Sequence, residues 1–262
     1  MRRVLHISDL HFGRTREDLL EPLIETINRL GPDMVAFSGD LTQRARESQF
    51  AQAADFISRL EMPVYTVPGN HDTPIDNPWL RFVKPFHRYR SLICEELEPE
   101  HIDEEVALIG VNTVNRFAWQ SGKISQRTIR RVCDAFAGAP DGRTHLAMMH
   151  HPLEHDPGTE KRLMRGARAA VACLGRCGAD VVLSGHLHNA AVAPLTAAPG
   201  VLLVQAGTGL SSRLREETNN FNLLHIEPDR IKVERYGAED RPRFEIIQTA
   251  RFAKGKGVWR EV

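Results

Sequence analysis

Between residue 3 and about residue 187, short runs rich in β-branched residues alternate with longer stretches that carry apolar residues at helical spacing. The short runs predict strands at 4–7, 34–38, 64–67, 106–111, 144–149 and 181–183. The longer stretches predict helices at 17–30, 47–60, 79–94, 124–137 and 161–176. A chain that alternates in this way covers its sheets with helices, which indicates an α/β fold.

After residue 188 the alternation stops. Further strands are predicted at 201–205, 221–227, 231–236 and 244–248, with no helices between them. We therefore expect antiparallel strands added to the core. The segments 74–78 and 194–200 are the best candidates for insertions, but neither has the composition of a linker. The sequence predicts a single domain over 1–262, with a core at 1–188 and a β-rich extension at 189–262.

The balance of charge restricts the partners of such a chain. It has 34 Lys and Arg, 34 Asp and Glu, and 12 His, so its formal net charge is zero. A protein that coats nucleic acid needs a basic excess to displace counterions, so no stable nucleic-acid complex is expected. No stretch approaches the ~20 apolar residues of a transmembrane helix.

The N-terminus and the cysteines favour a cytoplasmic location. The apolar run after the basic start ends at Ser8-Asp9, which is too short for the core of a signal peptide. The four cysteines are spread out, and we expect reduced, mostly buried thiols. They are Cys94, Cys133, Cys173 and Cys177. The last two form a lone C-x3-C, which is a weak metal or redox signal.

Five of the predicted strands end in Asp, Asn or His, often beside glycine. The strand ends are Asp9-Leu10-His11, Gly39-Asp40, Gly69-Asn70-His71-Asp72, His150-His151 and Gly185-His186-Leu187-His188. The D-x-H and G-D motifs are weak alone, because Asp in a turn usually makes local hydrogen bonds and a lone His is usually structural, whereas G-N-H-D and G-H-x-H are more specific. Five together indicate a site, because the carboxyl ends of strands form the ligand-binding crevice of open α/β sheets.

These residue types favour a two-metal centre. Carboxylate, amide and imidazole donors without any cysteine suit manganese, iron or zinc, and a pair of ions needs a shared carboxylate. Side chains at i and i+2 of an extended segment point the same way. We therefore expect Asp9 and His11 to hold one metal, and His186 and His188 to reach the pair together.

The order of these five motifs resembles the calcineurin-like metallophosphoesterase superfamily. The resemblance is strong over 4–188 and looser beyond it. Within the superfamily the chain looks most like the bacterial class III cyclic-nucleotide phosphodiesterase and glycerophosphodiesterase branch. The resemblance implies a four-layer α/β/β/α sandwich of two mixed β-sheets flanked by helices, with a dinuclear metal site at the C-terminal ends of the strands.

The resemblance also implies a role for each residue of the motifs. Asp9, His11 and His188 would hold the first metal, Asp40 would bridge, and Asn70, His150 and His186 would hold the second. His151 would be a neighbour of the centre or a substrate contact. His71 would face the substrate, and Asp72 would orient it through the other ring nitrogen.

The expected reaction is the hydrolysis of a small phosphodiester, of cyclic-nucleotide or glycerophosphodiester type. A hydroxide that bridges the two divalent ions would attack phosphorus, while Asn70 and the ions neutralise the non-bridging oxygens. His71 would donate to the developing phosphorane or protonate the leaving alkoxide. Two divalent ions, two carboxylates and one hydroxide leave about +1 in the site, which attracts an anion without a basic protein surface.

Three features outside the motifs bear on the substrate. Arg14 and Arg44 closely follow two ligand motifs and could hold a second phosphate or a carboxylate, unless they are ordinary exposed arginines. The segment 79–90 interleaves aromatic and basic residues. It could cap the site, stack a base or touch lipid headgroups, unless it is an amphipathic helix that buries its aromatic side chains. The basic tail at 251–260 is expected to be solvated.

Other activities stay open. One is a phosphomonoesterase or a nucleotide or lipid pyrophosphatase of the same superfamily. His71 stands where the lipid A precursor pyrophosphatases typically carry Arg, which counts against that branch. Another is a non-catalytic scaffold, which the intact set of ligands disfavours. The C-terminal strands could also form a homo-oligomer.

Overall fold

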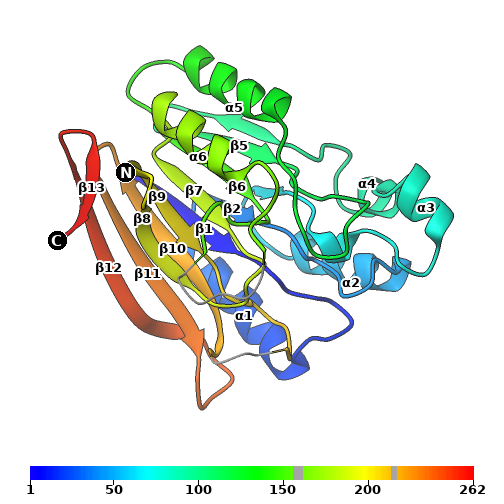
Figure 1. Cartoon of the computed structure of the whole chain (residues 1–262). Coiled ribbons are helices and arrows are strands. Elements are labelled where there is room, and N and C mark those ends of the chain that lie inside the picture. Colours follow the sequence, from blue (N-terminus) through cyan, green and yellow to red (C-terminus); the bar gives the residue numbers. More distant parts are fainter. Residues whose placement is uncertain (156–161, 214–216) are drawn as a thin grey trace.

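The computed structural model describes residues 1–155, 162–213 and 217–262, and it contains two mixed β-sheets packed face to face (Figure 1). The first sheet has seven strands in the order β13-β12-β11-β10-β1-β2-β3. Their bounds are β1 (Arg2–Ile7), β2 (Met34–Phe37), β3 (Val64–Thr66), β10 (Asn219–Glu227), β11 (Arg230–Ala238), β12 (Glu245–Gly255) and β13 (Val258–Glu261). Strands β1 to β3 run parallel, and β10 joins β1 antiparallel.

The second sheet has six strands in the order β4-β5-β6-β7-β9-β8. Their bounds are β4 (Glu100–Ile102), β5 (Val106–Val111), β6 (Thr144–Met149), β7 (Val181–Ser184), β8 (Ala191–Leu195) and β9 (Ala198–Gln205). The four central strands are parallel, and both edge strands are antiparallel to their neighbours. The C-terminal extension thus supplies strands to both sheets.

Helices cover the outer face of each sheet (Figure 1). Helices α1 (Leu20–Leu30) and α2 (Glu47–Ser58) pack on the first sheet, and α5 (Gln126–Gly138) and α6 (Ala167–Arg176) pack on the second. Short 3-10 turns at Glu17–Leu19 and Asn70–Asp72 and two short helices, α3 (Pro78–Val83) and α4 (His87–Leu92), complete the elements.

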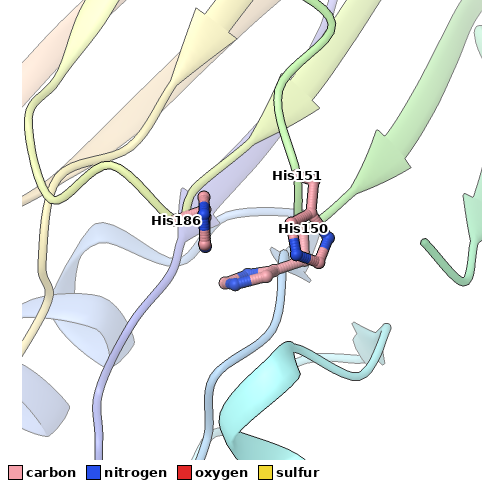
Figure 2. Close-up of side chains that lie close together, drawn as sticks. All are labelled: His150, His151 and His186. Carbon is pink, nitrogen blue, oxygen red and sulfur yellow. The ribbon is translucent and has the colours of Figure 1, made fainter. Parts of the chain in front are cut away.

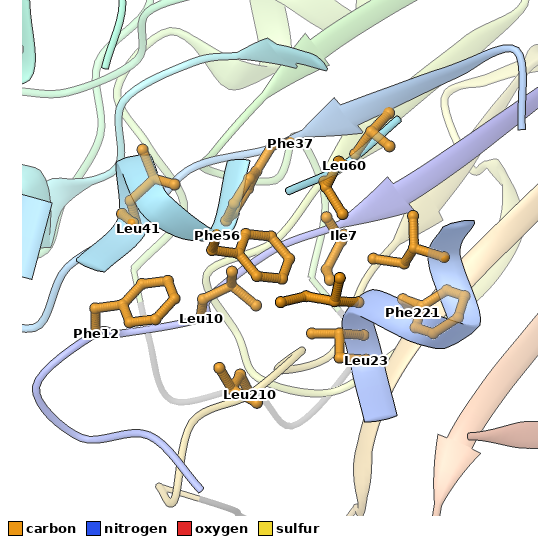
Figure 3. Packing of buried hydrophobic residues seen from close by; sticks show 14 of the residues in the cluster. Ile7, Leu10, Phe12, Leu23, Phe37, Leu41, Phe56, Leu60, Leu210 and Phe221 are labelled. Atoms are coloured by element: carbon orange, nitrogen blue, oxygen red, sulfur yellow. The ribbon is translucent and has the colours of Figure 1, made fainter. Parts of the chain in front are cut away.

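The alternation of side chains along each strand creates the layers. In β1, Leu5 and Ile7 face α1 and α2, whereas Val4 packs between the sheets. Figure 3 shows Ile7 and Leu23 in the helix-facing core, beside the rings of Phe37 and Phe56. With a second helix-facing cluster on the other sheet, the described residues form three buried apolar clusters between four layers. The predicted α/β/β/α sandwich is confirmed.

Two predicted helices differ from the structure. The single helix predicted at 79–94 is wrong, because Pro85 separates α3 from α4. A residue before proline avoids the helical region, and Lys84 has φ −133° and ψ 59°. The helix predicted at 161–176 begins only at Ala167, after Gly166 with φ 93°. The predicted start at residue 161 lies outside the described residues.

The expectations for the extension also need correction. Residues 194–200 are not an insertion but lie in the hairpin of β8 and β9. Strand β9 runs parallel to β7, so not every added strand is antiparallel. The predictions missed β4, β8 and β13, which are edge strands whose residues are mostly exposed or half-buried and so lack a continuous apolar run.

The prediction of uniformly reduced cysteines is wrong for one pair. Cys133 in α5 and Cys177 after α6 form a disulfide, with their Cα atoms 5.4 Å apart. The two helices pack side by side on one sheet, which brings together residues that lie 44 positions apart in the sequence. Cys94 and Cys173 are free thiols.

Within the described ranges, no helix is both long enough and apolar enough to cross a bilayer.

Candidate metal centre

The polar ends of five strands from both sheets meet at one place. All seven predicted ligands are buried, with at most 8% of any of them exposed. They are Asp9 and His11 after β1, Asp40 after β2, Asn70 after β3, His150 after β6, and His186 and His188 after β7. So many buried polar groups need partners, and a metal can supply them.

The first group of donors consists of Asp9, His11 and His188. Asp9 Oδ1 lies 3.2 Å from His188 Nε2 and 3.5 Å from His11 Nε2, and the two imidazole nitrogens are 3.1 Å apart. Asp9 Oδ1 is buried without a hydrogen-bond partner of good geometry. An orphaned carboxylate oxygen facing two ring nitrogens fits a bound cation.

The other oxygen of Asp9 is fully engaged. Asp9 Oδ2 accepts hydrogen bonds from Ser8 Oγ at 2.6 Å and from the His186 backbone N–H at 2.9 Å. These contacts fix the carboxylate so that only Oδ1 points at the imidazoles. Burial opposes ionisation, but the neighbouring imidazoles of His11 and His188 hold the pKa of Asp9 well below its usual range.

Asp40 lies between the two groups of donors. Its Oδ2 is 3.2 Å from His150 Nε2 and 3.8 Å from His11 Nε2, while its Oδ1 accepts from the His71 backbone N–H at 2.8 Å. Although burial opposes ionisation, the His150 and His71 imidazoles hold the pKa of Asp40 well below its usual range. Asp40 therefore faces both groups of donors, which is compatible with a bridging carboxylate.

The second group surrounds His150. Its Nδ1 lies 2.8 Å from the Ser38 carbonyl oxygen, so Nδ1–H donates there and Nε2 is directed at Asn70 Oδ1, 3.2 Å away. The centroid of the His186 ring lies 5.1 Å from that of His150, and Figure 2 shows the two rings near each other. Against the effect of burial, the Asp40 carboxylate raises the pKa of His150 to about 9.

His151 belongs to this neighbourhood in a different way. Its ring nitrogens lie 2.8 Å from Thr113 Oγ1 and 3.2 Å from the Gln120 carbonyl oxygen. The side chain is buried, and its ligand atoms lie within 4.8 Å of those of His150 and His186. The structure therefore places His151 beside the centre, as predicted for a neighbour, with Thr113 and Gln120 orienting its ring.

The backbone brings the ligands together by left-handed turns and not by strand alternation. Five ligands have positive φ: Asp9 54°, His11 52°, Asp40 55°, His186 73° and His188 64°. The expectation that each i, i+2 pair lies on an extended segment is therefore wrong. Such conformations cost about 1–3 kcal/mol each in a non-glycine residue, and they typically cluster at functional sites.

Two glycines allow the loops to approach one another. A Cβ added at Gly69 would lie 2.1 Å from Asp40 Oδ1, and one at Gly185 would lie 2.0 Å from Ser8 Oγ and 2.5 Å from Asp9 Oδ2. Any side chain at either position would displace a ligand carboxylate or its support.

His71 and Asp72 do not form the predicted pair. His71 Nδ1 lies 2.8 Å from the Gln43 carbonyl oxygen, which orients the ring. The Asp72 carboxylate instead accepts from the backbone N–H groups of Leu41, Thr42 and Gly69. Burial raises the pKa of Asp72 to about 6, and burial lowers the pKa of His71. Asp72 therefore ties the loops after β2 and β3 together.

A cavity of about 250 Å³ opens onto Asn70 and His71. Its other lining residues are Arg14, Gln43, Arg44, Ile75, Arg81, Trp119, Gln120 and Arg213. The structure thus brings both sequence-predicted arginines to the site. Sequence reasoning missed Trp119, Gln120 and Arg213, because they come from later loops and no motif marks them.

The profile of the calcineurin-like phosphoesterase family, Metallophos, matches residues 2–190. The chain belongs to this family. Membership of this family makes the chain a metal-dependent phosphoester hydrolase, and the match spans all seven buried donors.

Relatives of this metallophosphoesterase include phosphodiesterases. A probable cyclic nucleotide phosphodiesterase of Pseudoalteromonas sp. is 26% identical over 200 residues, which cover 71% of each chain. A probable glycerophosphodiester phosphodiesterase of Arcobacter nitrofigilis is 23% identical over 209 residues, again 71% of each. Both names agree with the branch that the sequence motifs resemble.

A solved structure agrees with the fold. The purple acid phosphatase PPD1 of yellow lupin superposes with a TM-score of 0.72 at 14% identity, over 97% of this chain and 54% of that one. At this identity the likeness concerns the fold alone.

Proposed function

We propose that this metallophosphoesterase hydrolyses a small phosphodiester, of cyclic-nucleotide or glycerophosphodiester type, with two divalent ions of manganese, iron or zinc. The observation that carries the proposal is the position of Asp40 between two complete donor groups. Asp9, His11 and His188 would hold one ion, and Asn70, His150 and His186 the other. This donor chemistry suits those three metals.

The two ions would supply Lewis acidity and an activated water for attack on phosphorus. The protein's own part is to present the substrate to them. Asn70 and His71 both line the cavity, so a phosphate seated there contacts the amide and the imidazole together. These two contacts, from Asn70 and His71, would fix the orientation of the ester before the reaction.

His71 is the proposed proton donor. The Gln43 carbonyl holds Nδ1–H, so the ring is fixed and Nε2 is left for the substrate. An anionic phosphate beside the ring favours the imidazolium, which can then pass a proton from Nε2 to the leaving oxygen. Protonation of the leaving oxygen matters most when that oxygen would otherwise depart as an alkoxide, which is a poor leaving group.

The test compares a diester with a monoester on the same metal-reconstituted protein. We expect bis-4-nitrophenyl phosphate to be hydrolysed with a kcat/KM at least about tenfold above that for 4-nitrophenyl phosphate, a difference of about 1.4 kcal/mol in transition-state binding. A preference for the monoester would assign the site to a phosphomonoesterase and contradict the proposal.

A further inference from the structure

The cavity over the metal centre is surrounded by positive charge. Arg14, Arg44 and Arg213 line it from three separate loops, and none of the lining residues is acidic. Among the described ranges, none of these three guanidinium groups forms an ion pair with a carboxylate. Three cations that share one cavity without internal counter-charges repel one another unless an anion joins them.

The backbone holds two of these arginines close together. Ser212 N–H donates to the Arg14 carbonyl oxygen at 2.7 Å, and Ser212 Oγ donates to the same oxygen at 2.9 Å. Residue 213 is therefore fixed next to residue 14, although the two are almost 200 positions apart. Arg213 Nη1 also lies 3.5 Å from Gln43 Oε1, which directs the side chain toward His71.

A fourth arginine of the cavity differs from these three. Arg81 is 8% exposed, and it donates to Thr73 Oγ1 and to the Ala118 carbonyl oxygen, both at 3.0 Å. Its guanidinium lies 5.5 Å from the ring centroid of Trp119. Arg81 thus supports the wall of the cavity, and the exposed Trp119 ring offers a flat apolar face for the organic part of a ligand.

We propose that Arg14, Arg44 and Arg213 bind a second phosphate group of the substrate. The substrate would then be a phosphodiester that carries at least one further phosphate besides the scissile one. This inference rests on the proposed function. A diester phosphate has one negative charge, which the metal centre already attracts, so three additional arginines exceed what that phosphate needs. A phosphomonoester group has up to two charges and three acceptor oxygens, which match guanidinium donors.

The test uses two chromogenic substrates with the same scissile bond. One is the 4-nitrophenyl ester of thymidine 5′-phosphate, and the other is the same molecule with a phosphate on its 3′-oxygen. Release of 4-nitrophenolate reports diester cleavage in both. We expect the wild-type kcat/KM to be at least about tenfold higher for the doubly phosphorylated substrate, since one charge-assisted contact exceeds about 1.4 kcal/mol.

The variants R14Q, R44Q and R213Q should each reduce this preference toward one. The matched control is R90Q, because Arg90 is an exposed arginine that does not line the cavity. It should keep the wild-type preference. Absence of a preference in the wild type would overturn the inference, as would equal losses on both substrates in the three variants. Activity on bis-4-nitrophenyl phosphate separates the two proposals. If the protein does not hydrolyse this diester, the proposed function itself fails. If the protein hydrolyses it but shows no preference for the doubly phosphorylated substrate, only the second-phosphate site fails.

Discussion

Asp40 Oδ2 lies 3.2 Å from His150 Nε2, and this contact joins the loop after β2 of one sheet to the loop after β6 of the other. The same oxygen lies 3.8 Å from His11 Nε2. One carboxylate therefore faces both groups of donors. The centre forms only when the two sheets pack against each other, because each sheet supplies some of the donors.

Replacing Asp40 should dismantle the centre. In D40N the amide can no longer bridge two cations, so we expect fewer than two metals per chain and at least about a 100-fold loss of diesterase activity. Metal content by mass spectrometry and turnover of bis-4-nitrophenyl phosphate check this. The control D55N removes an exposed carboxylate of α2 and should keep both values. Full metal occupancy in D40N would contradict the bridging role.

Gly185 should be intolerant of a side chain. In G185A the new Cβ would lie 2.0 Å from Ser8 Oγ and 2.5 Å from Asp9 Oδ2, so Asp9 must shift and metal affinity should fall by about 10–100-fold. Gly138 offers the matched control, because a Cβ there meets no atom within 4 Å. G138A should bind metal like the wild type. Equal affinities in the two variants would count against the packing argument.

His71 should matter most for poor leaving groups. H71A should lose at least about tenfold more rate on an alkyl phosphodiester than on a 4-nitrophenyl diester, because only the alkoxide needs a proton in the transition state. The ratio of kcat/KM values on the two substrates measures this. Equal losses would exclude the acid role.

Asp72 should behave differently from His71. Its carboxylate holds the N–H groups of Leu41, Thr42 and Gly69, so D72A leaves buried donors unpaired and should lower the free energy of unfolding by about 2–5 kcal/mol. Denaturant unfolding measures the loss. If Asp72 oriented His71, D72A would instead reproduce the leaving-group dependence of H71A.

His6 should make the protein sensitive to acid. Burial lowers the pKa of His6 from 6.5 to about 3, and its Nε2 contacts Ser38 Oγ at 2.9 Å. Between these pH values the unfolded chain binds a proton that the folded chain excludes. The contribution of neutral His6 to the free energy of unfolding is therefore fully present above pH 6.5, and it is lost progressively as the pH falls from 6.5 toward 3.

Unfolding by urea at pH 7 and pH 5.5 tests this linkage. The wild type should lose about 1 kcal/mol more stability than H6Q over that interval, because the variant keeps a polar partner for Ser38 but cannot titrate. An equal loss of unfolding free energy between pH 7 and pH 5.5 in both proteins would show that His6 is not the group responsible.

The sequence, with the family resemblance that it carries, was sufficient to predict the layers and to name the polar residues that the structure brings together. The alternation of strands and amphipathic helices predicts the α/β fold, the family resemblance implies the sandwich, and the polar strand ends predict that seven donors gather at one edge. The sequence does not reveal that Asp9 and His188 sit at positive φ, because the preference of Asp and His for that region is too weak to signal a left-handed turn. Tertiary packing imposes those conformations.

Other features depend on contacts between distant segments. Arg213 reaches the cavity only because the 212–213 segment bonds to Arg14, and a backbone carbonyl of Gln43 orients His71 without any motif. Cys133 meets Cys177 because two helices share one sheet face. Pattern reasoning along the chain cannot find pairs of this kind.

The most direct test of the central claim is to measure metal content and diester turnover on the same protein samples during reconstitution with manganese, iron or zinc. We expect two ions per chain and hydrolysis of bis-4-nitrophenyl phosphate that rises with occupancy of the second metal position. A chain that binds no metal and turns over no phosphodiester with any of the three would contradict that claim.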